Sequence, residues 1–260
     1  GVFANCNGLT DVLIGESLEE ITGAGDNREP GGLYFDGYGM FDGCTSLTNV
    51  HFGSSVATIG CGAFYGCSAL REIDVPSCVT AIKPYAFNAC PALQRVRLAD
   101  GGVTSIGQYA FKGDANLESI ALGNRLQSIG SCAFQSCTKL DNVILPDTLQ
   151  TLDTWCFNAC SALLRIEIPD SVINLNSGAF ANCPSLTTAK IGRGVLTVSG
   201  AEDDKQPGWS SFDGYGAFYN CEKLKTLQLG EGLTYIGNGA FYNCNELYDV
   251  TIPDAVTSIG

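Results

Sequence analysis

Cysteine offers the most chemistry in this sequence, because thiols form disulfides, bind metals and act as nucleophiles. Thirteen of the 260 residues are cysteines, and nine of them follow a recurring phenylalanine by three positions. These nine are Cys6, Cys44, Cys67, Cys90, Cys137, Cys160, Cys183, Cys221 and Cys244. In stacked repeats, equivalent side chains lie about 4.8 Å apart and run parallel, whereas a disulfide needs Cβ atoms about 3.5–4.5 Å apart that face each other. We therefore expect this row to be a buried ladder of thiols, which only Asp114 interrupts.

The remaining cysteines give little support for a metal or disulfide site. Cys61, Cys78, Cys132 and Cys156 fall at four different positions of the repeat, so any disulfide would have to come from among them. There is no C-x-x-C pair, and His51 is the only histidine. Zinc sites are built mainly from such residues, so we expect no bound metal.

No catalytic arrangement can be recognised in the sequence. His51 falls on an outward strand position and has no partner that marks it as a base. The S-x-x-K sequence from Ser136 to Lys139 belongs to the repeat framework around Cys137. We therefore expect a protein that is not an enzyme and needs no cofactor.

The phenylalanine that precedes each cysteine defines the repeat. It returns at intervals of mostly about 23 residues, within the range of short solenoid repeats, at Phe3, Phe41, Phe64, Phe87, Phe111, Phe134, Phe157, Phe180, Phe218 and Phe241. A leucine follows at +6 and further apolar residues at +9 and +11, as in Leu70, Ile73 and Val75. This is the L-x-x-L-x-L spacing of leucine-rich repeats. Because a unit this short cannot bury its own apolar face, the units must stack into a solenoid.

The apolar pattern also predicts the elements of each unit. Alternation along residues 71–75 predicts one short strand per unit, paired in parallel with the same strand of the next unit. A second apolar pair, such as Val79 and Ile82, predicts a shorter strand on the opposite flank. The segment from Tyr85 to Cys90 has room for about one turn of helix. We predict an α/β solenoid of ten units of about 23 residues.

The units LREIDVPSCVTAIKPYAFNAC and LLRIEIPDSVINLNSGAFANC resemble the BspA-like leucine-rich repeats of microbial cell surfaces. The resemblance covers nearly the whole chain. It implies an extracellular or surface-attached protein whose repeats adhere to host-surface or extracellular-matrix proteins. Both chain ends fall inside a repeat, so residues 1–260 are expected to be a single domain from a longer array, open to end-to-end self-association.

Composition excludes two classes of partner. The net charge is -13, whereas nucleic acids and anionic membranes are bound by clustered basic surfaces. No apolar run approaches the roughly 18–20 residues that a membrane-spanning helix needs. A protein ligand is therefore the expected partner.

Two insertions interrupt the period, at residues 23–38 and 200–215. Both contain the sequence Phe-Asp-Gly-Tyr-Gly, which begins at Phe35 and again at Phe212 and indicates duplication of a larger block. Long loops on a rigid repeat often bind ligands, and exposed aromatics dominate recognition surfaces. The candidate residues are Tyr34, Tyr38, Trp209 and Tyr215. Alternatively, the aromatic residues anchor each loop to the flank of the solenoid.

The outward positions of the predicted strands form the other candidate surface. Their residues vary from unit to unit while the framework stays constant, and the candidates are Arg71, Asp74, Arg97, Glu167 and Lys190. A solvated face of mixed charge would show the same variation. The sequence thus predicts a protein-binding or adhesion module, with a structural spacer between other surface modules as the alternative.

Overall fold

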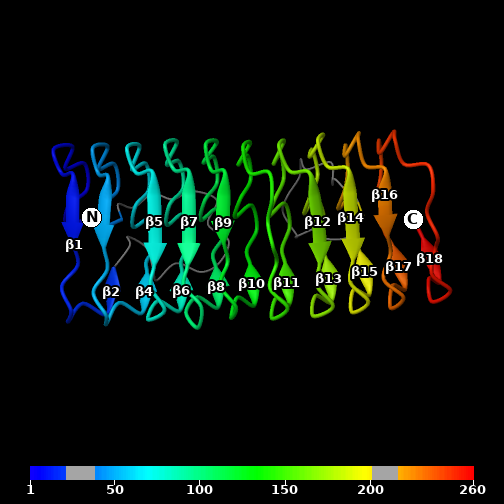
Figure 1. The fold of residues 1–260 in the computed structure, drawn as a ribbon, viewed down its shortest axis with the longest axis horizontal. Coiled ribbons are helices and arrows are strands. Elements are labelled where there is room, and N and C mark those ends of the chain that lie inside the picture. Colours follow the sequence, from blue (N-terminus) through cyan, green and yellow to red (C-terminus); the bar gives the residue numbers. More distant parts are fainter. Residues whose placement is uncertain (22–38, 201–215) are drawn as a thin grey trace, which may run out of the picture.

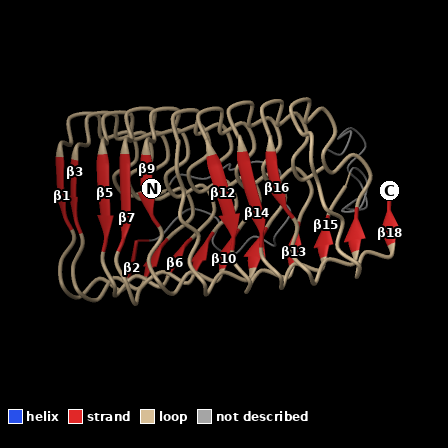
Figure 2. Cartoon of the chain, turned by 45° about the vertical axis from the view of Figure 1, so that its right-hand side comes forward, coloured by secondary structure: helices blue, strands red, loops and turns tan. Residues whose placement is uncertain are grey.

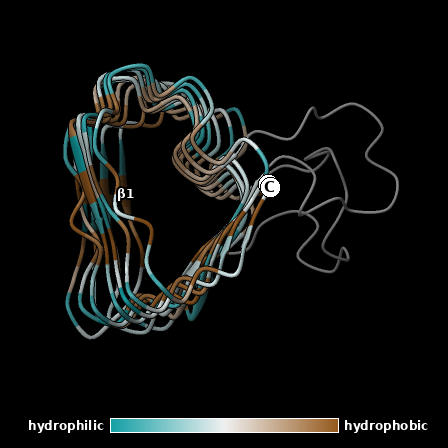
Figure 3. Cartoon of the chain, turned by 90° about the vertical axis from the view of Figure 1, so that its right-hand side faces the viewer, coloured by the Kyte–Doolittle hydropathy of each residue, from teal (hydrophilic) through white to brown (hydrophobic). Residues whose placement is uncertain are grey.

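The computed structural model describes residues 1–21, 39–200 and 216–260. The chain winds into a parallel β-solenoid of leucine-rich-repeat type, in which each coil lies beside the next (Figure 1). Viewed along the axis, the coils superpose on one outline (Figure 3). This superposition follows from the regular spacing of the phenylalanines, because equal repeats stack their equivalent residues.

The predicted first strand is present in most coils. These strands are β1 (Asp11–Leu13), β3 (Asn49–His51), β5 (Glu72–Val75), β7 (Arg95–Leu98), β9 (Ser119–Ala121), β12 (Arg165–Ile168), β14 (Thr188–Ile191) and β16 (Thr226–Gln228). They form three separate parallel sheets, β1-β3, β5-β7-β9 and β12-β14-β16. In two coils the strand is reduced to isolated bridges, at Asn142 and Asp249. The face that these strands form, called the strand face below, is therefore interrupted along its length.

The shorter second strand is confirmed. It occurs as β2 (Glu20–Ile21), β4 (Thr58–Ile59), β6 (Ala81–Ile82), β8 (Ser105–Ile106), β10 (Ser128–Ile129), β11 (Thr151–Leu152), β13 (Asn174–Leu175), β15 (Thr197–Val198), β17 (Tyr235–Ile236) and β18 (Ser258–Ile259). Together these strands form one continuous ten-stranded parallel sheet. This sheet also joins neighbouring coils whose first strands do not pair, such as those of β3 and β5.

The predicted helical turn is wrong, because the described residues contain no helix (Figure 2). Tyr85 and Ala89 have φ angles of 60° and 59°, which a right-handed helix does not allow. The amide of Phe87 donates to the carbonyl of Ala110 in the next coil, at 2.8 Å. Alternate backbone amides of this segment therefore donate to carbonyls of the neighbouring coil rather than to carbonyls within the segment. The fold class is accordingly all-β rather than α/β.

The phenylalanine row forms a continuous stack through the core. The rings of Phe64 and Phe87, for example, lie 5.2 Å apart at an interplanar angle of 4°. Seven cysteines of the predicted ladder are buried, whereas Cys6 is exposed and Cys244 is half-buried in the first and last coils. None of the thirteen cysteines, all of which are described, forms a disulfide. The buried thiol ladder predicted from the spacing is thus confirmed for the inner coils.

Candidate functional site

Four of the predicted strand-face residues form two ion pairs with each other. Asp74 of β5 lies opposite Arg97 of β7, and their charged groups are 3.2 Å apart. Glu167 of β12 lies opposite Lys190 of β14 at 3.9 Å. The side chains of Asp74 and Arg97 remain 74% and 69% exposed. Exposed pairs of this kind add little stability, so these charges remain accessible to a partner.

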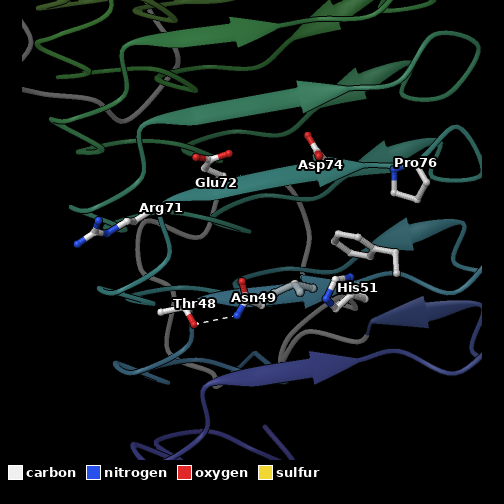
Figure 4. Close-up of a pocket in the computed structure, with 9 residues that line it drawn as sticks. Thr48, Asn49, His51, Arg71, Glu72, Asp74 and Pro76 are labelled. Carbon is white, nitrogen blue, oxygen red and sulfur yellow. Dashed lines mark hydrogen bonds between the residues drawn. The ribbon is translucent and has the colours of Figure 1, made fainter.

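The fifth residue, Arg71, lines a hollow between β3 and β5. This hollow, called hollow 1 below, measures about 500 Å³. It is lined by Thr48, Asn49, Val50, His51, Phe52, Arg71, Glu72, Asp74 and Pro76. Figure 4 shows that these side chains come from two neighbouring coils. The structure therefore brings two predicted site residues, Arg71 and Asp74, to one concave site.

Hollow 1 lies where the strand face is interrupted. β3 pairs with β1, and β5 pairs with β7, but β3 and β5 belong to different sheets. In the paired part of the face, the amide of Gln94 donates to the carbonyl of Arg71 at 2.7 Å. Among the described residues, no such backbone bond joins β3 to β5. Backbone donors and acceptors of both strands therefore face the hollow.

Polar contacts order the floor of hollow 1. The side-chain amide of Asn49 donates to Thr48 at 3.2 Å and to Asp11 of β1 at 2.6 Å. Hydrogen bonds from Thr10 and Asn49 hold the pKa of the Asp11 carboxyl below its usual value. These two hydrogen bonds hold the Asn49 side chain in place, which keeps this part of the hollow polar.

The remaining predictions fall outside the described residues. Tyr34, Tyr38, Trp209 and Tyr215 lie in residues 22–38 and 201–215, as do the insertions apart from Gly200. Their part in binding stays a prediction.

A column of aromatic side chains on another edge of the coil was missed by sequence reasoning. The rings of Tyr85 and Tyr109 pack together, tilted by 33° with centroids 4.9 Å apart, and the Lys112 ammonium lies 4.9 Å from the Tyr109 centroid. Trp155 occupies the same repeat position two coils beyond Tyr109. The available signal was a bulky residue two positions before the phenylalanine, where Gly62 stands in an earlier unit.

The described residues contain neither a metal-binding cluster nor a membrane-spanning helix. Within residues 1–21, 39–200 and 216–260, no group of three or more His, Cys, Asp or Glu could hold a metal ion. Over the same ranges, no helix is long and apolar enough to cross a bilayer. The strand face is the candidate site because hollow 1 combines Arg71 and Asp74 with the backbone of two strands that do not pair.

The model of the BspA type leucine rich repeat region matches residues 37–120, 104–201 and 213–260. The chain belongs to the BspA-type leucine-rich repeat family. Among solved structures, the leucine-rich repeat protein TpLRR of T. pallidum is 29% identical, with a TM-score of 0.58. The match covers 68% of this chain and 78% of that one. The resemblance stated from the repeat sequences is thus confirmed.

Two further similarities are more distant. A leucine rich cell surface protein from Faecalibacterium prausnitzii is 21% identical over 88% of this chain and 62% of its own, with a TM-score of 0.42. The pneumococcal vaccine antigen PcpA is 18% identical over 95% of this chain and 62% of its own, with a TM-score of 0.44. This chain therefore spans less than two thirds of either protein. No curated protein matches its sequence significantly.

Proposed function

We propose that the chain is a non-enzymatic protein-binding module of a microbial cell-surface or secreted protein. The single observation that carries the proposal is hollow 1, which combines exposed charges with backbone groups of two strands that do not pair. Strand edges bind extended polypeptide, and charges around them select the partner. BspA-type family membership supports the surface location, as does the description of the F. prausnitzii protein as a cell surface protein.

The geometry of the solenoid suits this role. Stacked coils give a rigid, extended surface on which side chains can vary without disturbing the core. The exposed ion pair of Asp74 and Arg97 can exchange its partner for a ligand at little cost, because such pairs contribute roughly 0–1 kcal/mol. A preformed surface also loses little conformational entropy on binding.

The test is a binding screen against purified extracellular-matrix and host-surface proteins, read by surface plasmon resonance. The strand-face variant carries Arg71→Ala, Asp74→Ala and Arg97→Ala. The control variant carries Lys83→Ala, Arg125→Ala and Asp147→Ala, which remove the same charges from positions off that face. We expect the strand-face variant to weaken binding at least about tenfold, or about 1.4 kcal/mol, and the control to leave it unchanged.

Two outcomes would contradict the proposed surface. If Tyr34→Ala and Trp209→Ala each cost more than about 1 kcal/mol while the strand-face variant binds normally, the insertions are the binding site. If the chain binds no member of the panel, the structural spacer becomes the better account.

A further inference from the structure

A second hollow repeats the lining of hollow 1. This hollow, called hollow 2 below, measures about 420 Å³ and lies between β16 and the last coil. It is lined by Lys225, Thr226, Leu227, Gln228, Leu229, Glu231, Tyr248, Asp249, Thr251 and Pro253. Every lining residue of hollow 1 has a counterpart in hollow 2 at one constant offset along the chain, from Thr48 and Lys225 to Pro76 and Pro253. The same offset separates the two Phe-Asp-Gly-Tyr-Gly sequences, so the hollows are equivalent parts of the duplicated block.

Both hollows lie where strand pairing is weakened, since it is missing between β3 and β5 and incomplete between β16 and the last coil. On the strand face of the described residues, pairing between β16 and the last coil is reduced to the isolated bridge between Thr226 and Asp249. The backbone bond that would link Tyr248 to Lys225, equivalent to the one from Gln94 to Arg71, is not formed. Pairing across hollow 2 is therefore reduced to this one bridge, and the backbone amide of Tyr248 makes no bond to Lys225 across it.

The retained residues indicate the chemistry of the ligand. A carboxylate occurs at the same position in both hollows, Glu72 in hollow 1 and Asp249 in hollow 2. Both hollows end at a proline, Pro76 and Pro253. The chain as a whole carries a net charge of -13, which attracts cationic partners. Open strand backbone favours an extended peptide. A basic side chain on that peptide can bind Asp249 in hollow 2 and can replace Arg95, the exposed partner of Glu72, in hollow 1.

We propose that hollows 1 and 2 are equivalent sites for a basic, extended peptide segment, and that the partner carries two copies of this segment. The proposal rests on the proposed function, because both hollows belong to the strand face. The hollows lie seven coils apart, or about 34 Å at the spacing of β-strands. About ten extended residues are needed to span that distance, so one chain with two such segments can fill both hollows.

The test starts from short linear peptides selected on the immobilised chain from a random display library. Calorimetry is expected to give two peptides per chain, and one peptide for either Glu72→Lys or Asp249→Lys. The double variant is expected to bind none, and Asp147→Lys, which changes a carboxylate outside both hollows, to bind two. Glu72→Gln and Asp249→Asn provide milder variants if charge reversal disturbs folding.

A tandem peptide tests the pairing of the sites. Two copies joined by a linker longer than about ten residues should bind at least about a hundredfold more tightly than one copy, and either single variant should abolish the gain. One peptide per chain, with Asp249→Lys without effect, would overturn the equivalence while leaving the proposed function intact. A library that yields no binder sensitive to Glu72 or Asp249 would overturn the peptide sites, and a chain that binds no member of the protein panel would overturn the proposed function.

A separate observation concerns Asp114, the carboxylate within the thiol ladder. Asp114 is fully buried, and its Oδ1 accepts the backbone amide of Cys90 at 2.7 Å. Its Oδ2 has no hydrogen-bond partner. In most other inner coils, the cysteine amide donates instead to the backbone carbonyl of the phenylalanine three residues earlier, as the amide of Cys137 does to the carbonyl of Phe134.

The backbone carbonyl of Phe87 lacks the two hydrogen-bond donors that the equivalent carbonyl has in other coils. The equivalent carbonyl of Phe111 accepts a hydrogen bond from the thiol of Cys137 in the next coil, at 3.2 Å. For Phe87 the next coil supplies Asp114 in place of that thiol, and the Cys90 amide is diverted to Oδ1. Among the described residues, no hydrogen bond to the Phe87 carbonyl is formed. The buried carbonyl oxygen of Phe87 and the buried Oδ2 of Asp114 thus both lack a hydrogen-bond donor.

We infer that Asp114 is a neutral carboxylic acid in the folded chain, and that its Oδ2–H takes the place of the missing thiol toward the Phe87 carbonyl. Burial raises the pKa of Asp114 well above its usual value. The titratable groups that face it are the thiols of Cys90 and Cys137, and burial raises the pKa of both. No cation that could hold Asp114 ionised is among these groups.

This assignment makes stability depend on pH in a defined direction. The folded chain keeps a proton that the unfolded chain releases above pH 3.8, the ordinary pKa of Asp. The unfolding equilibrium constant is therefore expected to rise up to tenfold per pH unit above that value, until the folded carboxyl ionises. Acid pH thus favours the folded solenoid at this position.

The test compares the chain with Asp114→Asn and Asp114→Cys by urea denaturation between about pH 4 and pH 8. Asn keeps the acceptor and adds an N–H donor, and Cys restores the ladder. Both variants should gain stability relative to the native chain as pH rises, and infrared spectra should lose the carbonyl band of a protonated carboxylic acid. A constant stability difference across this range, together with an unchanged infrared band, would overturn the assignment.

Discussion

The thiol of Cys160 donates a hydrogen bond to the backbone carbonyl of Phe134, which lies 3.3 Å away in the preceding coil. The same carbonyl accepts the amide of Cys137 within its own coil. The cysteine row therefore does more than fill space, because every thiol of the row except that of Cys6 in the first coil is hydrogen-bonded to the coil before it. This explains a framework of cysteine where any small apolar residue would satisfy packing.

The first prediction concerns this bond. Cys160→Ala removes both the thiol donor and its buried volume, and should lower the free energy of unfolding by about 1–2 kcal/mol. Cys160→Ser keeps a donor in reach of the Phe134 carbonyl, so it should cost no more than Ala. Urea denaturation measures both. The control is Cys6→Ala, at an exposed position, which should change stability by less than about 0.5 kcal/mol. Equal losses at Cys6 and Cys160 would contradict the role of the ladder.

The second prediction concerns alkaline pH. Burial raises the pKa of Cys67 to about 12 and that of Cys160 well above its usual value. The folded chain therefore keeps thiol protons that the unfolded chain loses above about pH 8.5. Stability present below that pH should be lost as pH rises, by up to about 1.4 kcal/mol per pH unit for each buried thiol.

Denaturation of the native chain and of Cys160→Ala between about pH 7 and pH 10 measures this loss. The variant lacks one such thiol, so its deficit relative to the native chain should shrink as pH rises. Parallel stability curves would show that Cys160 does not titrate differently in the two states.

The third prediction concerns the aromatic column. Gly178 has a φ of 63°, and a Cβ atom placed there would overlap the indole of Trp155 in the preceding coil. Gly178→Ala should therefore cost about 2 kcal/mol or more. Gly113→Ala is the matched control, because its φ is 80° but nothing lies within 4 Å. The difference between the two variants, measured by urea denaturation, isolates the overlap. If adding Trp155→Gly to Gly178→Ala fails to recover that difference, the assigned contact is wrong.

The sequence was sufficient for the solenoid because its framework repeats in register. Phenylalanine, cysteine and leucine return at the same spacing, so strands, core and ladder followed directly from stacking. The helical turn was predicted from length alone. Tyr85 and Trp155 adopt positive φ angles, which aromatic residues rarely do, and the signal for this was the glycine at the equivalent position of other units, Gly62, Gly178 and Gly239.

The candidate site was less accessible to sequence reasoning. Asp74 and Arg97 occupy the same position in consecutive units, so their pairing could have been predicted from the period. Hollow 1 could not have been predicted in this way, because the loss of pairing between β3 and β5 leaves no pattern in the residue types. The duplicated block was visible in the insertions, but its effect on the strand face is seen only when the coils are placed side by side.

The most direct test of the central claim, that the strand face binds protein, is amide hydrogen exchange with and without a partner from the binding screen. Partner binding should slow exchange in residues 48–52 and 71–76, which border hollow 1, and in residues 225–231 and 248–253, which border hollow 2. Protection confined to the ten-stranded sheet or to residues 22–38 and 201–215 would contradict it.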